Sequence, residues 1–507
     1  MAALPIGTIS DVAAGQLSGS QRRTSLVPAR EGAFWVLLTL ALPRAVGAVV
    51  TVLLRRVLGP AVSGTFDLAL TPYQLFDGFR TIGTGPALVY KREMTAELAN
   101  TAWVLNMLGA LLVAALAQLL AHPVAAYYGH PAIENIFRVL AVAYVFTSVS
   151  SVHYFLLLRA RNFRARSIPA IGQVVVATVL ALLLALWGFG VGALVAREIA
   201  SAAAGAVLLW AVYPFRPRIQ LIPELARELL SYGIWISAAM TLLFVSQNVD
   251  VFIGGRIIRS TADIGFYTTS WSVAFIAAGI FTALASSLAF PSLSRLQDDA
   301  EALRRMLLKA VRQLMMCMLP AGALLAVLAP VFIVPVLGEK WEAYRSSFMV
   351  LSLLSLYAAN RTVLAIFFEG YKSIGKPWII ALYNGAKLAI MIPAMILGAR
   401  HGVLGLAVTY VPIQLVEVPV SLLLARKVLH VAVRDVWQTG RAPVIASAGM
   451  CGVVVIAEAM LLNGAHLADA STLLVCGALG VVTYLGLLAL LDRSVLREGW
   501  HVILSGL

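Results

Sequence analysis

Apolar runs of about 20 residues recur along the whole sequence, and this recurrence limits the chain to one class of structure. Hydrophobic residues make up 61% of the 507 residues, charged residues make up only 12%, and the mean hydropathy is +0.89. A helix of about 20 apolar residues crosses the roughly 30 Å hydrocarbon core of a bilayer and satisfies its backbone groups internally. The sequence therefore predicts an all-α, polytopic transmembrane helix bundle.

We expect about fourteen spans, joined by loops no longer than about 25 residues. Their predicted ranges are 33–54, 63–89, 99–120, 132–158, 168–188, 190–212, 229–255, 264–291, 311–336, 346–370, 377–399, 402–424, 442–462 and 471–491. Residues 1–30 contain three arginines but no apolar core of a secretory signal. We expect this segment to be a disordered cytoplasmic tail.

Lys and Arg are unevenly divided between the two sets of loops. With the amino terminus inside, the cytoplasmic segments contain 25 of the 38 basic residues and the opposite loops contain seven. Basic residues accumulate in cytoplasmic loops, so we expect both termini in the cytoplasm. The net charge of +14 is scattered over these short loops instead of forming one patch, which argues against a nucleic-acid partner.

An internal repeat divides the predicted helices into two lobes. The segment Arg56–Phe66 after the first span returns in looser form as Arg256–Phe266 after the seventh, and similar echoes link the starts of the fourth and tenth spans and of the sixth and twelfth. Six spans separate each pair, so the halves share one topology and are related by an axis along the membrane normal. We expect a six-helix lobe at 31–213, a second at 214–425 and two additional helices in 426–507, with a site between the lobes.

Charges inside the spans mark the candidate interior. Arg44 stands in the middle of the first span, directly after Pro43, which removes a helical hydrogen bond. An arginine at that depth costs roughly 2.5 to 3.5 kcal/mol and faces a bundle interior or a wet cavity. The six basic residues within spans are Arg44, Arg80, Arg138, Arg197, Arg361 and Lys387.

Acidic residues inside the spans are candidates for ion coupling. Buried carboxylates in transporters often carry protons or bind sodium. We select Asp250, Asp67 and Asp77 from the eight acidic residues in or beside spans. Asp250 shares one helical turn with Gln247 and Asn248, which indicates a wet lining. The alternative for Asp250 is a hydrogen-bonded contact between helices.

Five segments carry a resemblance to a known family. They are Leu58-Gly59-Pro60 with Gly64, Gly83–Tyr90, His153–Phe163, Phe290–Gln297 and Leu337–Trp341. In order and spacing they resemble the polysaccharide-transport flippases, the Wzx-type exporters of O-antigen and exopolysaccharide units, which share a superfamily with the lipid II flippase and multidrug extruders. The resemblance implies a multi-pass protein of the bacterial inner membrane. It also implies alternating-access transfer of undecaprenyl-pyrophosphate-linked oligosaccharide from the cytoplasmic to the periplasmic leaflet.

Such a cargo agrees with the interior cations, because the planar fork of arginine donates two hydrogen bonds to phosphate. Arg44 with Gly47 coincides with the first-helix Arg-x-x-Gly of the lipid II flippase, and Arg80 coincides with an arginine of its second helix. Val50 replaces the other first-helix arginine of that pattern, so an identical binding geometry is not expected. We expect substrate contacts from the residues Arg44, Arg80, Arg361, Lys387 and Asn248. The alternative is that Arg44 and Arg80 form structural ion pairs with Asp67 or Asp77.

No pattern of an enzyme is present. The sequence contains no Gly-rich phosphate loop, no His-Glu-x-x-His and no Gly-x-Ser-x-Gly, and its three cysteines lack the spacing of a metal site or a disulfide framework. We therefore predict a transporter without cofactor or metal, whose partners are the lipid-linked oligosaccharide, membrane lipid, a coupling proton or sodium ion, and other polysaccharide assembly proteins. The alternatives are a multidrug exporter on the same fold, a membrane-embedded glycan polymerase or ligase, and a non-transporting scaffold.

Overall fold

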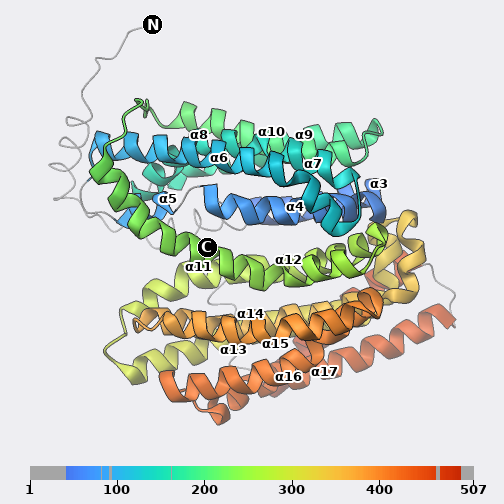
Figure 1. Cartoon of the computed structure of the whole chain (residues 1–507). Coiled ribbons are helices and arrows are strands. Elements are labelled where there is room, and N and C mark those ends of the chain that lie inside the picture. Colours follow the sequence, from blue (N-terminus) through green and yellow to red (C-terminus); the bar gives the residue numbers. More distant parts are fainter. Residues whose placement is uncertain (1–41, 81–82, 91–93, 161–162, 464–468, 493–507) are drawn as a thin grey trace, which may run out of the picture.

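The computed structural model describes residues 42–80, 83–90, 94–160, 163–463 and 469–492. Within these ranges every regular element is a helix (Figure 1). Twelve of the helices are long and apolar enough to cross a membrane. The predicted all-α transmembrane architecture is thereby confirmed. The predicted tail at 1–30 and the first part of the predicted span 33–54 lie outside the described residues.

The helices up to residue 212 pack together as one layer, which we call the N-terminal lobe (Figure 1). Its elements are α3 (Leu42–Leu58), α4 (Pro60–Arg80), α5 (Thr84–Tyr90), α6 (Ala96–Tyr128), α7 (Ala132–Leu140), α8 (Val142–Arg159), α9 (Phe163–Leu186) and α10 (Val191–Val212). Small side chains allow close approach of membrane helices, and α6 presents such a stripe of buried alanines at Ala110, Ala117, Ala121 and Ala125.

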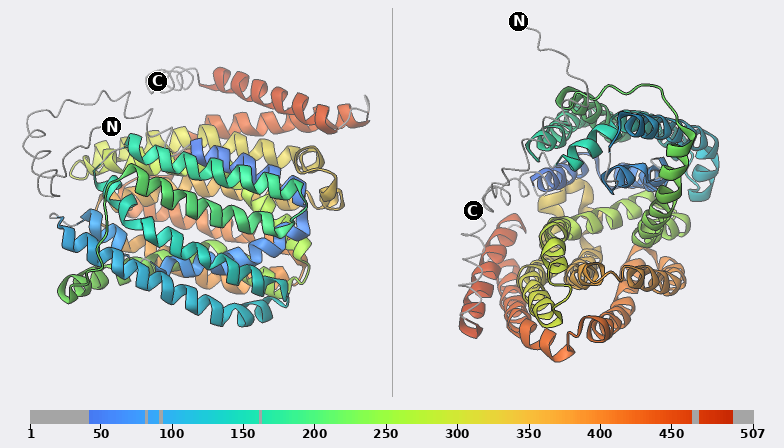
Figure 2. Two further views of the ribbon diagram at one scale, coloured as in Figure 1. Left: turned by 90° about the horizontal axis from the view of Figure 1, so that it is seen from above. Right: turned by 90° about the vertical axis from the view of Figure 1, so that its left-hand side faces the viewer.

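The helices from residue 223 to residue 429 form the second layer, which we call the C-terminal lobe (Figure 1). Its elements are α11 (Pro223–Ile257), α12 (Thr261–Ser294), α13 (Ala300–Phe332), the short helices η2 (Ile333–Leu337) and η3 (Glu339–Ser347), α14 (Met349–Ser373), α15 (Trp378–Ala399) and α16 (Gly402–Leu429). Two further helices, α17 (Val433–Asn463) and α18 (Asp469–Leu491), pack on α13 at the outside of this lobe (Figure 2).

Two of the predicted spans are interrupted. In place of one helix over 63–89, α4 ends at Arg80 and α5 begins at Thr84. Gly83 lies between them with a left-handed φ of 65°, and a side chain there would overlap the main chain of Gly233 on α11. The predicted span 132–158 likewise divides into α7 and α8 at Ala141. An unbroken run of apolar residues does not indicate where a helix is interrupted.

The largest displacement of a predicted boundary is at the start of the span predicted over 311–336. The span expected to begin at residue 311 belongs to α13, which begins at Ala300. Asp299 caps this helix by accepting hydrogen bonds from the main-chain amides of Glu301 and Ala302. The added turns are polar, and Arg304 in them pairs with Asp435 at 2.7 Å. A hydropathy criterion excludes these turns because they extend beyond the apolar stretch.

The two lobes are joined most closely where α4 crosses α12. Gly64 and Gly265, which occupy equivalent places in the predicted repeat, face each other at this crossing. A Cβ atom on Gly64 would overlap the carbonyl oxygen of Thr261, and one on Gly265 would overlap the carbonyl oxygen of Pro60. Only glycine at both positions allows the backbones to approach this closely. We call this end of the molecule, with the loops at Gly59 and Arg259, the junction end.

The short helices η2 and η3 close the junction end over the last turn of α3. Trp341 is fully buried, and its indole N–H donates to the carbonyl oxygen of Arg55 at 3.1 Å. Lys340 donates to the carbonyl oxygen of Val57, and Arg56 donates to the carbonyl oxygen of Val336 at 3.0 Å. Two of the last four carbonyl groups of α3, those of Arg55 and Val57, therefore accept hydrogen bonds from the C-terminal lobe.

Candidate functional site

A cavity of about 250 Å³ lies between α3 of the N-terminal lobe and α12 of the C-terminal lobe. It is lined by Arg44, Ala48, Thr51, Val52, Arg55, Thr269, Ser272, Val273, Phe275, Ile276, Gly279 and Ile280. We call it the interlobe cavity. Because its walls come from both lobes, any motion of one lobe against the other changes its shape.

Arg44 lines this cavity, and its side chain is exposed. It lies 14 residues before the end of α3 at Leu58, which corresponds to about 21 Å from the junction end at 1.5 Å per residue. The carboxylates considered as its partners pair with other arginines: Asp67 with Arg55 and Asp77 with Arg80. The alternative that Arg44 braces the lobe through Asp67 or Asp77 thus loses its geometric basis.

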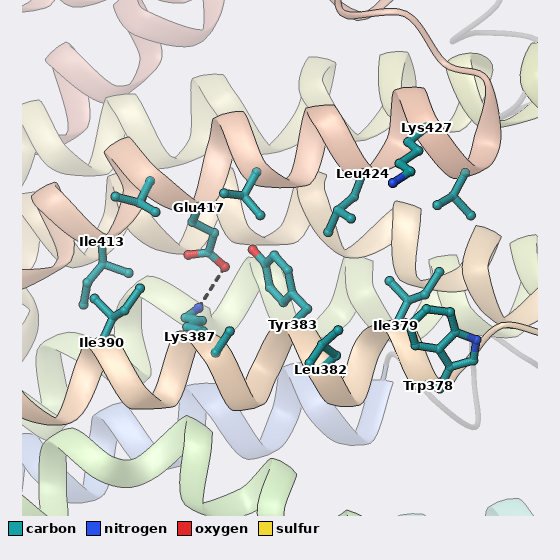
Figure 3. Close-up of a pocket in the computed structure, with 14 residues that line it drawn as sticks. Trp378, Ile379, Leu382, Tyr383, Lys387, Ile390, Ile413, Glu417, Leu424 and Lys427 are labelled. Atoms are coloured by element: carbon teal, nitrogen blue, oxygen red, sulfur yellow. Dashed lines mark hydrogen bonds and ion pairs between the residues drawn. The ribbon is translucent and has the colours of Figure 1, made fainter.

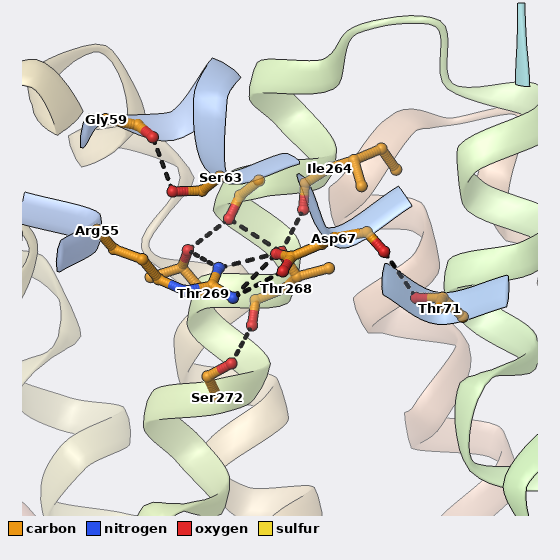
Figure 4. Close-up of polar contacts among 10 residues, drawn as sticks. Arg55, Gly59, Ser63, Asp67, Thr71, Ile264, Thr268, Thr269 and Ser272 are labelled. Carbon is orange, nitrogen blue, oxygen red and sulfur yellow. Dashed lines mark hydrogen bonds and ion pairs between the residues drawn. The ribbon is translucent and has the colours of Figure 1, made fainter. Parts of the chain in front are cut away.

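Arg55 also lines the cavity, closer than Arg44 to the end of α3 at Leu58, and its polar contacts are drawn in Figure 4. Its guanidinium bonds to the Asp67 carboxylate at 2.9 to 3.0 Å and donates to the Thr269 hydroxyl at 2.6 Å. Thr268 donates to the same carboxylate from α12. Arg55 and Asp67 are only 8% and 6% exposed. This buried network, which we call the Arg55–Asp67 lock, ties the two lobes together.

Arg361 approaches the cavity from the C-terminal lobe. Its guanidinium carbon lies 5.5 Å from the ring centroid of Phe275, and Phe275 lines the cavity. A cation over an aromatic face is held by the ring quadrupole. Three guanidinium groups, those of Arg44, Arg55 and Arg361, therefore lie at or beside one cavity.

Asp250 lies in a separate cluster inside the C-terminal lobe, where it is 1% exposed. One carboxylate oxygen accepts hydrogen bonds from the hydroxyls of Tyr267 at 2.6 Å and Tyr410 at 2.9 Å, and the other accepts from the main-chain amide of Val251. Within the described residues these partners are neutral donors and include no cation. Such a carboxylate differs from Asp67, whose charge is balanced by an arginine.

Aromatic rings connect this carboxylate with the interlobe cavity. Tyr410, which donates to Asp250, lies 5.5 Å from Trp271 between ring centroids. Trp271 stacks on Phe275 at 4.4 Å, and Phe275 lines the cavity. Tyr267, Trp271 and Phe275 all belong to α12, so a change in the charge of Asp250 acts on the helix that forms one wall of the cavity.

The other predicted site residues lie elsewhere. Arg80 bonds to Asp77 at 2.7 Å and to the hydroxyl of Ser148 at 2.8 Å, so its contacts stay within the N-terminal lobe. Asn248 donates to the carbonyl oxygen of Phe244 in its own helix. Neither residue lines the interlobe cavity.

Lys387 lines a groove between α15 and α16, where its side chain faces Glu417 (Figure 3). It pairs with Glu417 at 2.8 Å and donates to the hydroxyl of Tyr357 at 3.0 Å. Its ammonium group therefore already has a carboxylate partner, and it lies in a groove between α15 and α16 that is distinct from the interlobe cavity.

Sequence reasoning missed Arg55. The predicted first span ended at Leu54, so Arg55 was counted with the loops of the opposite side, although α3 continues to Leu58. The sequence carries no signal that distinguishes Arg55 from its loop neighbour Arg56, because the repeat begins at Arg56. No group of three or more His, Cys, Asp or Glu side chains in the described ranges is arranged to hold a metal ion.

Comparisons with known proteins agree with this arrangement. The chain is 26% identical over 451 residues to the succinoglycan biosynthesis transport protein ExoT of Rhizobium meliloti (strain 1021), which covers 88% of this chain and 90% of that protein. It is 22% identical over 400 residues to the lipopolysaccharide biosynthesis protein WzxC of Escherichia coli (strain K12). This match covers 77% of this chain and 79% of that protein.

Solved structures show the same fold. The lipid II flippase MurJ in an inward closed conformation matches with a TM-score of 0.71 at 13% identity, over 92% of this chain and 100% of that chain. A multidrug resistance MATE family transporter in an inward-facing conformation matches with a TM-score of 0.62 at 14% identity. The match covers 78% of this chain and 98% of that chain. Residues 53–346 match a family described as polysaccharide biosynthesis protein, and the chain therefore belongs to that family.

Proposed function

We propose that this protein is a flippase that moves an undecaprenyl-pyrophosphate-linked oligosaccharide across the bacterial inner membrane. The observation that carries the proposal is the position of Arg44 and Arg55 on one membrane-embedded cavity between the lobes, with Arg361 beside it. A pyrophosphate cannot enter hydrocarbon without counter-charge, and forked guanidinium groups provide it with paired hydrogen bonds.

Arg44 and Arg361 receive the pyrophosphate in this proposal. Arg55 already bonds to Asp67 and Thr269 and its charge is balanced by that carboxylate, so we assign it to holding the lobes together. The volume of about 250 Å³ is small for a ligand site, and it accommodates a phosphate group more readily than a whole glycan. The sugars enter as the lobes move apart.

The junction end faces the periplasm in this proposal, as the distribution of basic residues predicts. Both termini then lie in the cytoplasm. The glycine crossing and the Arg55–Asp67 lock hold the periplasmic side closed in this conformation. The lipid-linked cargo enters from the cytoplasmic side, and breaking these contacts opens the opposite path.

The name of ExoT, a succinoglycan transport protein, supports the same class of cargo for this chain. A multidrug exporter on this fold would handle cationic drugs. The guanidinium group of Arg44 opposes that function, because it repels a cation from the cavity.

Asp250 is the proposed coupling residue, through a proton or a sodium ion. Its hydroxyl partners Tyr267 and Tyr410 offer oxygen atoms suited to either ion. Asp250→Asn keeps the size of the side chain, so we expect the protein to fold while transport loses its dependence on an ion gradient. Comparing transport after collapse of the proton gradient and after sodium depletion identifies the ion. Undiminished gradient dependence in Asp250→Asn would remove Asp250 from this role.

The decisive experiment tests Arg44 in a strain whose surface polysaccharide depends on this gene. We expect Arg44→Ala to abolish polysaccharide export and to accumulate lipid-linked glycan on the cytoplasmic side, at normal protein abundance. Arg44→Lys should restore export only in part, because a point charge replaces a bidentate fork.

The matched control is Arg138→Ala, since Arg138 forms an exposed pair with Glu134 and does not line the cavity. This variant should export normally. Full export by Arg44→Ala, with protein abundance equal to that of Arg138→Ala, would overturn the proposed pyrophosphate site.

A further inference from the structure

A second cavity, of about 380 Å³, runs as a groove between α15 and α16 (Figure 3). Its walls include apolar side chains that the protein leaves uncovered, among them Leu382 at 65% and Ile390 at 54% exposure. Both helices belong to the predicted membrane spans, and α16 lies on the side of its lobe that is remote from the N-terminal lobe (Figure 1). The groove therefore opens toward the hydrocarbon of the bilayer.

The floor of the groove contains the ion pair of Lys387 and Glu417, whose side chains are 13% and 7% exposed. Removing both charges from water is costly, and a lower local dielectric strengthens the attraction between them. The Oε2 atom of Glu417 has no hydrogen-bond partner within the described residues. An acyl chain lying over this floor excludes water and so strengthens the attraction within the pair, but it offers no hydrogen bond to this oxygen.

One mouth of the groove carries a cation and an indole. Lys427 lines this mouth and is exposed, and within the described residues no carboxylate lies within ion-pair distance of it. Trp378 lines the same mouth at 62% exposure (Figure 3). Tryptophan and basic residues at the end of a span mark the level of lipid headgroups. This mouth therefore offers charge complementarity to a negatively charged headgroup.

The length of the groove fits a lipid inserted from one leaflet. Lys427 and Ile413 bound it along α16, and their separation of 14 residues corresponds to about 21 Å. That distance is less than the hydrocarbon thickness of roughly 30 Å. An acyl chain anchored at Lys427 passes over the Lys387–Glu417 pair and ends inside the groove. A much longer polyprenyl chain would leave it.

We infer that this groove binds one phospholipid with an anionic headgroup, from the leaflet on the side of Lys427. The phosphate of the headgroup contacts the Lys427 ammonium, and one acyl chain lies between α15 and α16 over the Lys387–Glu417 pair. The site is separate from the interlobe cavity and does not depend on the proposed cargo. In this inference Lys387 forms part of the floor of a lipid site.

The test is native mass spectrometry of the purified full-length protein, with phosphatidylglycerol or phosphatidylcholine added at equal concentration. We expect one phosphatidylglycerol to be retained at collision energies that remove phosphatidylcholine. Val420→Trp fills the groove and Lys427→Gln removes its cation, so each should weaken phosphatidylglycerol binding at least fivefold. Lys427→Gln should also abolish the preference over phosphatidylcholine.

Matched controls lie on the same helix. Leu423 is 57% exposed and Arg426 is exposed, but neither lines the groove, so Leu423→Trp and Arg426→Gln should bind as the unaltered protein does. If Val420→Trp misfolds, Leu424→Trp serves as the second groove-filling variant. Equal binding of the two phospholipids, equal weakening in the control variants, or displacement of phosphatidylglycerol by inorganic phosphate alone would overturn the inference.

Discussion

The two lobes meet in two ways along the same pair of surfaces. At the junction end, Gly64 and Gly265 bring α4 and α12 into backbone contact, and Arg55 is satisfied by Asp67 and Thr269. Further along α3, the surfaces part around Arg44 and leave the interlobe cavity. The first region is closed and has its charges paired within the protein, whereas the second leaves space beside a guanidinium group. Burial alone therefore does not identify a ligand site, because an arginine can be buried to hold the lobes together.

The largest expected effect comes from the glycine crossing. Gly64→Val places a branched side chain against the main chain of α12, so the junction end cannot close, and both folded protein and transport should be lost. The measurements are thermal stability in detergent and polysaccharide export. Gly452→Val on α17 is the matched control, since no atom lies within 4 Å of a Cβ there. A stable, active Gly64→Val variant would contradict the tight crossing.

The next effect comes from the Arg55–Asp67 lock. Asp67→Ala leaves the Arg55 guanidinium buried without its counter-charge, which costs about 3 to 5 kcal/mol. We expect a clear loss of thermal stability that the double variant Arg55→Met with Asp67→Leu largely restores. Asp67 was also predicted to couple ions, and a double variant that still depends on the ion gradient would exclude that role. Equal stability of Asp67→Ala and the unaltered protein would show that the lock contributes nothing.

The smallest effect concerns orientation and should leave function intact. In a background without Cys317, Cys451 and Cys476, we introduce Glu342→Cys at the junction end and Gln297→Cys at the opposite end; both positions are exposed. An impermeant thiol reagent added from the periplasm should label only position 342. Labelling at position 297 under the same conditions would reverse the assignment of the closed end.

Helices and their order could be predicted from the sequence because long apolar runs have few alternatives. We expect Arg44 at a cavity because exposing a guanidinium to lipid is costly, and Arg44 lines the interlobe cavity. The pairing of charges could be predicted only in part. The alternative that pairs Arg80 with Asp77 agrees with the structure. Asp67 pairs with Arg55 instead of Arg44, and this pairing depends on the turn at Gly59 and on hydroxyls of α12 more than 200 residues away.

The interruptions and extensions of helices could not be predicted from the sequence either. At Gly83 the chain packs closely against Gly233 on another helix, and the hydropathy of the sequence does not indicate that contact. The polar turns of α13 from Ala300 are helical because of a cap at Asp299 and an ion pair with Asp435. The cluster around Asp250 was indicated by its polar neighbours in sequence, yet its actual partners, Tyr267 and Tyr410, come from two other helices.

The attachment of α3 has a mechanical consequence. By sequence α3 belongs to the N-terminal lobe, where it packs on α9, but its final carbonyl groups are held by Trp341 and Lys340 of the C-terminal lobe. In the proposed transport cycle a helix fastened to both lobes cannot follow both, so rocking of the lobes has to bend or slide it. Gly47, less than one turn after Arg44, is the residue of this part of α3 at which the helix bends most easily. The proposed cycle therefore makes the position of the Arg44 guanidinium depend on the opening between the lobes.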